Sequence, residues 1–372
     1  MSDFNNHVFD KNSSSNIINI KAPLYHEASK AEQRGTVGVY GISLCGISHI
    51  AQKQCCQDYN DFLYLPDENI WILAIADGVG SCSLSHWGAY IAVSKAIEFL
   101  QIHLRSQKNL LKHAKHLNDY TIEEIEALYN DTFIFAQEEV ENFADANEQS
   151  VFNFQSTLTV ALYDGQLLYC CHVGDDGIVA EGVSGKYQMV TERIKGDEAN
   201  SVYTLQSSCW SIRRINNVIA LVLSTDGILD SYVGNTFTNN RVYYPFFQKL
   251  TYSMKVLPGK SPQKAVEDAC ATAIRMLIQK AATGVSDDMT VLVAVNQAML
   301  DRPTSPQFSK EAWDKETEQL RRKQYNLLYR SSATPISVND SIDKVVHIPD
   351  KKKWNLHERT VDLIKRGRKD EK

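Results

Sequence analysis

The sequence IWILAIADGVGS, from Ile70 to Ser81, decides the fold of this chain. Its first seven residues are all apolar, and Asp77 and Gly78 then open a glycine-rich turn. A short apolar run that ends in turn residues predicts a β-strand buried on both of its faces. An acid at the end of such a strand stands on a rigid platform, from which its side chain can reach a cleft.

Five more apolar runs bounded by turn residues follow along the chain. They are Thr157–Leu162, Gln166–Val173, Ile178–Glu181, Val218–Ser224 and Met289–Val295. A hairpin signal, Tyr163-Asp164-Gly165, separates the first two runs. Helical spacing of apolar residues predicts helices over Trp87–Leu104, Ile122–Phe143 and Pro262–Ala281. Strands joined by hairpins, with helices between them, indicate an α+β fold in which antiparallel sheet is flanked by helices.

The composition is that of an ordinary globular protein, since 43% of the 372 residues are hydrophobic and 23% are charged. No apolar run approaches the roughly 20 residues that a membrane-spanning helix needs, and the first residues do not resemble a signal peptide. A net charge of −6 argues against nucleic-acid binding by the protein surface as a whole. The eight cysteines include no Cys-x-x-Cys pair, so they predict buried thiols rather than a zinc site. We therefore expect a cytoplasmic protein without a membrane anchor.

Three regions of the chain differ in character. Residues 1–35 are polar and weakly patterned, and they predict a flexible or loosely attached arm. Residues 36–296 alternate apolar runs with turn signals, as a packed domain does. Residues 297–372 predict a charged, partly helical extension with a basic end. That end could contact nucleic acid, an acidic partner or a membrane surface, or it could be a solvated tail.

The informative acids lie where the apolar runs begin or end. Asp77, Asp175, Asp226 and Asp287 each stand at one end of a predicted strand, and the first three have a glycine beside them. One Asp-Gly pair is usually only a turn, so the recurrence after separate strands carries the inference. Carboxylates that share a cleft repel one another, and a divalent cation removes that conflict. Oxygen-only ligands favour Mg²⁺ or Mn²⁺, and two such ions would activate a bridging water against a phosphate ester.

Six motifs occur in the order found in the type 2C family of metal-dependent Ser/Thr protein phosphatases, which the chain resembles from about residue 38 to 295. They are Lys53–Asp58, Ala74–Ser81, Gln155–Thr157, His172–Asp176, Leu223–Asp230 and Gly284–Val291. The second is similar to the family's Asp-Gly-His/Met-Gly-Gly element, the fourth to Val-Gly-Asp-Ser, and the fifth to Ala-Ser-Asp-Gly-Leu-Trp-Asp. The resemblance implies a four-layer α/β/β/α sandwich of two antiparallel sheets flanked by helices.

The resemblance also implies how the acids would share the ions. Asp77 would bridge two cations, and the carbonyl group of Gly78 would assist at one of them. Asp226 and Asp287 would complete the second position. Asp58 would act through cation-bound waters.

A third and weaker ion would be held by Asp175 together with Asp226, so the expected cofactors are two or three Mg²⁺ or Mn²⁺ ions. The family's phosphate-binding arginine corresponds to Lys53, and the expected catalytic residues are Lys53, Asp77 and Asp226. The implied reaction is hydrolysis of phosphoserine or phosphothreonine by a metal-activated water. The implied partner is a phosphorylated protein, such as a cognate Ser/Thr kinase or its target, and the sequence defines no oligomeric state.

Two departures from the family motifs keep a second function open. Lys53 lacks the bidentate hydrogen bonding of arginine, and Val79 replaces the histidine that is the usual general-acid candidate. The chain could therefore be a catalytically weak or inactive pseudophosphatase that binds phosphoproteins, although it retains all the candidate carboxylates. His86 follows the Asp77 turn and is either a replacement acid or an ordinary residue at a helix start. Aspartate-nucleophile chemistry is disfavoured, because it needs a carboxylate at position 224, which is serine.

Overall fold

The computed structural model describes residues 25–111, 114–193, 202–234, 241–282, 285–301 and 315. One sheet has six strands in the order β1 (Glu27–Arg34), β2 (Val37–Leu44), β11 (Met289–Asn296), β10 (Val218–Ser224), β7 (Gly177–Gly182) and β8 (Tyr187–Met189). The other has five, in the order β3 (Tyr59–Leu65), β4 (Ile70–Ala76), β5 (Leu158–Tyr163), β6 (Leu168–Val173) and β9 (Ser211–Ile215). All neighbouring strands are antiparallel.

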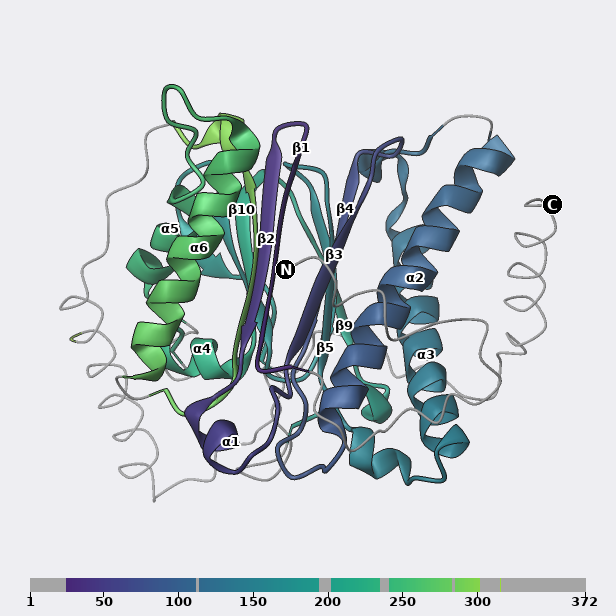
Figure 1. The fold of residues 1–372 in the computed structure, drawn as a ribbon. Coiled ribbons are helices and arrows are strands. Elements are labelled where there is room, and N and C mark those ends of the chain that lie inside the picture. Colours follow the sequence, from purple (N-terminus) through teal and green to yellow (C-terminus); the bar gives the residue numbers. More distant parts are fainter. Residues whose placement is uncertain are drawn as a thin grey trace, which may run out of the picture.

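The described helices are α1 (Ile47–Ala51), α2 (Ser85–Leu111), α3 (Ile122–Ala146), α4 (Asp226–Tyr232), α5 (Tyr244–Tyr252) and α6 (Pro262–Ala281). Figure 1 shows four layers, with the green helices α4, α5 and α6 outside the six-stranded sheet and the blue helices α2 and α3 outside the five-stranded one. The α+β sandwich of two antiparallel sheets, predicted from the sequence, is confirmed. The predicted bounds of β4, β10 and α6 match to within one residue.

Strand β4 shows how one apolar run serves two cores. Trp71, Leu73 and Ile75 belong to the cluster between the two sheets, and Ile72 and Ala74 belong to the cluster beneath α2 and α3. Every residue of β4 is at most 1% exposed, which is why the run has no polar alternation. Each large side chain buried in this way contributes about 1.5–3 kcal/mol to stability.

Two helix starts follow local signals. The Thr121 hydroxyl accepts a hydrogen bond from the Glu124 amide at 3.2 Å, and the Glu124 carboxylate accepts one from the Thr121 amide at 2.8 Å, which makes a capping box for α3. At α6, Ser261 Oγ accepts from the Lys264 amide at 3.2 Å, and Pro262 occupies the first helical turn. These caps need no tertiary contact.

The polar stretch before position 36 differs from its prediction. Strand β1 lies inside residues 1–35 and pairs with β2 along its whole length, from Glu27 opposite Leu44 to Arg34 opposite Val37. It is an edge strand whose residues are exposed or half-buried, so no apolar run marks it in the sequence. Residues 1–24, and the extension beyond position 301 except residue 315, lie outside the described residues. The rest of the domain division therefore stays a prediction.

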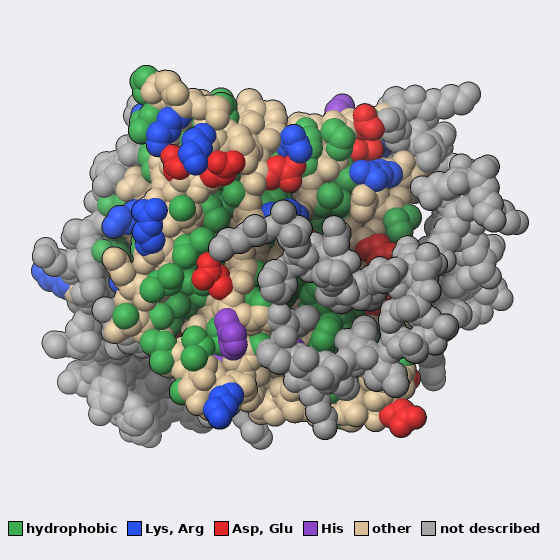
Figure 2. All heavy atoms as spheres, in the orientation of Figure 1, with side chains coloured by type: hydrophobic (Ala, Val, Ile, Leu, Met, Phe, Trp, Pro, Cys, Tyr) green, Lys and Arg blue, Asp and Glu red, His purple; other side chains and the backbone are tan. Residues whose placement is uncertain are grey.

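Six of the eight cysteines are buried, as the sequence predicts, whereas Cys82 and Cys209 are half-buried. All eight cysteines are free thiols, and burial raises the pKa of Cys170 to about 12. Within the described residues, no helix combines the length and apolar character needed to cross a bilayer. On the face in Figure 2, the described lysine and arginine side chains near the top lie beside acidic side chains, and others, at the left and at the bottom, stand apart from them.

Candidate active site

Strand register brings the predicted acids to one end of the sandwich. Tyr59 pairs with Ala76, so Asp58 and Asp77 lie side by side where β3 begins and β4 ends. Each acid is separated from the others by long stretches of sequence. The antiparallel pairing therefore brings these acids together, which no local sequence signal could do.

The other sheet completes this end. Ser224, the last residue of β10, pairs with the first residue of β7 on one side and with the beginning of β11 on the other. Asp226 therefore lies near Asp175, in the turn between β6 and β7, and near Asp287, just before β11.

Three carboxylates meet at this end of the sandwich. One oxygen from each of Asp77, Asp175 and Asp226 lies within 4.8 Å of the others. Asp175 is 8% exposed, and the other two are half-buried. A donor set made only of carboxylate oxygens at this spacing fits a hard divalent cation such as Mg²⁺ or Mn²⁺.

Burial and mutual repulsion raise the pKa values of Asp77 and Asp226. Burial is the largest cause of the raised pKa of Asp77, and the charges of Asp58 and Asp226 come next. Burial, followed by the charge of Asp175, raises the pKa of Asp226 to about 6. Without a cation, these two carboxyl groups therefore keep their protons to a higher pH than free aspartates do, and a binding cation would compete with those protons.

Asp58 lies directly behind the three-residue cluster. Its side chain is 2% exposed, and Thr225 Oγ1 donates a hydrogen bond to its Oδ2 at 2.7 Å. Its charge raises the pKa of Asp77, although no Asp58 oxygen belongs to the cluster itself. Its action through cation-bound waters stays a prediction.

The neighbours Asp287 and Asp288 have different surroundings. Asp287 is exposed, outside the three-residue cluster, and its charge raises the pKa of Asp226. Asp288 is 3% exposed, and its two carboxylate oxygens accept hydrogen bonds from the backbone amides of Gly46 and Gln57, each at 2.5 Å. Asp288, which sequence reasoning did not single out, thus ties the segments around α1 to the start of β11.

The remaining predicted site residues lie in turns, Lys53 after α1 and Gly78 directly after Asp77. Lys53 is exposed, has a φ of 59°, and its amide donates to a carbonyl of α1 at 3.0 Å. Among the described residues, no hydrogen bond or ion pair joins the Lys53 side chain to the acids, so its phosphate contact stays a prediction. Gly78 pairs with Ser156 in an isolated bridge, and the amide of Val79 donates to the carbonyl of Gln155 at 3.0 Å.

His86 is a poor proton donor in this structure. It is the second residue of α2 and is 8% exposed, and burial lowers its pKa to about 4. The ring is therefore neutral at pH 7. A replacement-acid role, one of the two readings of the sequence, loses support on this ground.

We expect His86→Ala to lower the melting temperature and to leave the shape of the pH dependence of kcat unchanged. The reason is that a neutral buried ring contributes packing and has no proton to give. His103→Ala is a matched control, since this second α2 histidine also has a pKa lowered by burial. Loss of a kinetic pKa in the His86 variant alone would restore the acid role.

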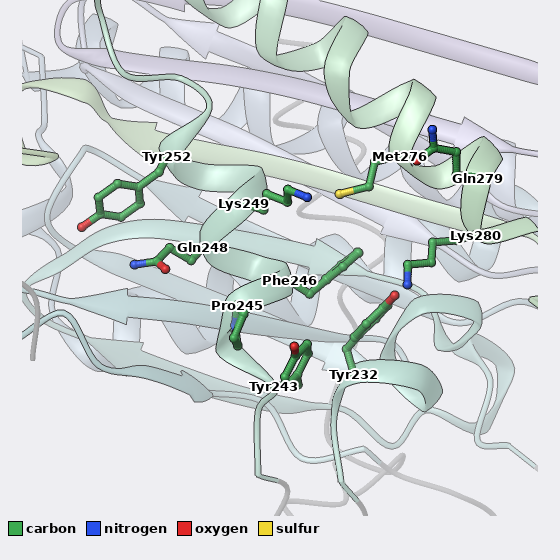
Figure 3. Close-up of a pocket in the computed structure, with 10 residues that line it drawn as sticks. All are labelled: Tyr232, Tyr243, Pro245, Phe246, Gln248, Lys249, Tyr252, Met276, Gln279 and Lys280. Atoms are coloured by element: carbon green, nitrogen blue, oxygen red, sulfur yellow. The ribbon is translucent and has the colours of Figure 1, made fainter. Parts of the chain in front are cut away.

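A separate concavity of about 950 Å³ lies on the outer helices α4, α5 and α6. Figure 3 shows Tyr232, Phe246 and Lys280 facing one another across it. The rings of Tyr232 and Phe246 stack at 3.8 Å, and Lys280 Nζ lies 5.3 Å from the Tyr232 ring centre. None of the predicted site residues lines this concavity, so it is not part of the candidate active site.

Sequence comparison gives one family. The profile of the family described as protein phosphatase 2C matches residues 45–269, which is more than half of the chain. No curated protein sequence matches the chain.

Solved structures of similar shape come from several organisms. The serine/threonine phosphatase Stp1 from Staphylococcus aureus is 14% identical, with a TM-score of 0.47, and the match covers 69% of this chain and 94% of that one. PppA from Pseudomonas aeruginosa is 17% identical, with a TM-score of 0.42, covering 73% and 97%. A sex-determining protein of C. elegans is 13% identical, with a TM-score of 0.47, covering 73% and 69%. Likenesses this distant say nothing about what the chain acts on.

Proposed function

Since this chain belongs to the protein phosphatase 2C family, we propose that it hydrolyses phosphoserine or phosphothreonine on proteins, using divalent cations held by its clustered aspartates. The observation that carries the proposal is the meeting of Asp77, Asp175 and Asp226 within 4.8 Å. Acids that approach so closely raise one another's pKa, and a protein keeps them ionised at neutral pH most readily by binding a cation.

Bound Mg²⁺ or Mn²⁺ would supply a water of lowered pKa and positive charge for the phosphate oxygens. The protein's own contribution is to hold the carboxylates still. The Asp77 amide donates to Thr157 Oγ1 at 2.7 Å, and the Asp77 carbonyl accepts from the Thr157 amide at 2.8 Å. The carbonyl of Asp175 accepts from Arg193 Nε at 2.8 Å, and Asp226 is fixed as the first residue of α4.

The finer assignments follow the family motifs. Asp58 and Asp287 would complete the cation sites, the Gly78 carbonyl would assist, and Lys53 would attract the phosphate group as a point charge. The proposed substrate is a phosphorylated protein, either a Ser/Thr kinase or the target of one. Without a histidine at position 79, the leaving alkoxide would take its proton from water.

A direct assay tests the proposal against the pseudophosphatase alternative. The full chain is incubated with p-nitrophenyl phosphate and with phosphoserine and phosphothreonine peptides, in EDTA, in Mg²⁺ and in Mn²⁺. We expect turnover only with the added cations. Phosphopeptide binding without turnover in either cation would overturn the enzyme and favour the binding module.

The affinity for Mn²⁺ should depend on pH. Because the pKa of Asp226 is raised to about 6, this carboxylate is mostly protonated below that pH and must lose its proton before a cation binds. We expect the apparent Kd to rise about tenfold per pH unit below pH 6 for each proton released, and to level off above pH 7. Calorimetric titration between pH 5 and 8 measures this, and a flat profile would contradict it.

A further inference from the structure

Asp176 is a further buried acid beside the clustered carboxylates. Asp176, next to Asp175 in the turn between β6 and β7, is fully buried. Its Oδ2 accepts a short hydrogen bond from Thr157 Oγ1. Its Oδ1 has no hydrogen-bond partner among the described residues. An unpaired buried oxygen is destabilising, and more so when it is charged, so this atom points to a bound cation or its water.

Electrostatics couple this carboxylate to the clustered acids. The charge of Asp176 raises the pKa of both Asp77 and Asp58, and the charge of Asp226 acts in turn on Asp176. Burial is the largest cause of the raised pKa of Asp176, while the nearby Arg193 guanidinium works in the opposite direction and favours the anion.

Hydrogen-bond roles make Asp176 part of the support of Asp77. The Thr157 hydroxyl has one proton, and its oxygen already accepts from the Asp77 amide at 2.7 Å. The proton is donated to Asp176, which lies closer than the other acceptor, the Asp77 carbonyl at 3.5 Å, and this fixes the rotation of the hydroxyl. Gly174 lets the turn approach this closely, because it has a φ of +114° and a Cβ there would lie 2.4 Å from Thr157 Cγ2.

We propose that Asp176 supports cation binding at this centre from outside the three-acid cluster, with one oxygen positioning Asp77 through Thr157 and the other adding negative charge toward a bound cation or its water. The inference rests on the proposed function and deepens it. The similar family motif, Val-Gly-Asp-Ser, has serine at this place, so the extra carboxylate belongs to this chain. The site is consequently more negative, which strengthens cation binding and makes the metal-free fold less stable.

Asp176→Asn in the full chain tests the proposal, because asparagine keeps the size of the side chain and an acceptor for Thr157 while removing the charge. We expect the Kd for Mn²⁺, measured by calorimetry, to rise about 10–100-fold. We also expect a higher melting temperature without metal, since one of several like charges is gone, and a smaller rise on adding Mn²⁺. A purely structural acid would instead lower the melting temperature equally with and without Mn²⁺.

Glu181→Gln is the matched control. Glu181 is also a fully buried carboxylate, and it accepts a hydrogen bond from the Tyr187 hydroxyl at 2.7 Å. It is not one of the clustered acids. Its variant should bind Mn²⁺ like the wild type. Wild-type affinity in Asp176→Asn would overturn the inference and leave the proposed function standing, whereas absence of Mn²⁺ binding by the wild type would overturn the proposed function first.

Discussion

Asp77→Asn is expected to lower kcat/KM for a phosphoserine peptide in saturating Mn²⁺ by roughly 10³-fold, which corresponds to about 4 kcal/mol of transition-state stabilisation. Asp77 has an oxygen in the three-acid cluster, and its backbone is clamped by Thr157 on both its amide and its carbonyl. Asparagine keeps these backbone contacts and the fold, while the site loses one charge and one carboxylate oxygen. The measurement is steady-state kinetics together with Mn²⁺ titration.

The control for this result is Asp268→Asn. Asp268 is an acid of α6 that forms ion pairs with Lys260 and Lys264 on the surface and is not one of the clustered acids. Its variant should retain wild-type kcat/KM and Mn²⁺ affinity, since surface pairs contribute little to stability. Activity in Asp77→Asn within a few-fold of the wild type would remove the clustered acids from the mechanism.

Gly227→Ala should damage both the fold and the activity. A Cβ at this position would lie 1.9 Å from the carbonyl oxygen of Asp288, a backbone atom that cannot turn aside. The start of α4 would have to separate from the segment before β11, which moves Asp226 away from Asp287. We expect a loss of about 3 kcal/mol in the free energy of unfolding and a fall of at least about 10²-fold in kcat/KM.

Chemical denaturation and kinetics measure the two effects of this substitution. Gly182→Ala in β7 is the control, because a Cβ there meets no atom closer than 3.8 Å. It should change stability by less than about 1 kcal/mol. Equal behaviour of the two variants would mean that the close contact of Gly227 with Asp288 does not hold the site together.

Local sequence signals were sufficient for the strands beside Asp77, Asp175, Asp226 and Asp287, but not for β3, which begins after Asp58. Apolar runs marked β4 and β10 because both faces of these strands are buried, and the helix α6 begins at a serine cap followed by proline. The acids beside these runs were recognisable as candidates because turn residues follow each strand directly. The strand β1 was not recognisable, since an edge strand of polar residues is stabilised by its pairing with β2 and leaves no pattern of its own.

The sequence by itself therefore determined the α+β class, six of the eleven described strands and the identity of the candidate acids, because apolar runs and turn residues are local features of the chain. Only the tertiary structure decided which acids meet. Antiparallel register set Asp77 against Asp175 and Asp226, brought Asp288 to the amides of Gly46 and Gln57, and brought Asp176 to Thr157. These relations join residues far apart in the chain, and their spacing depends on strand pairing, which no local pattern encodes.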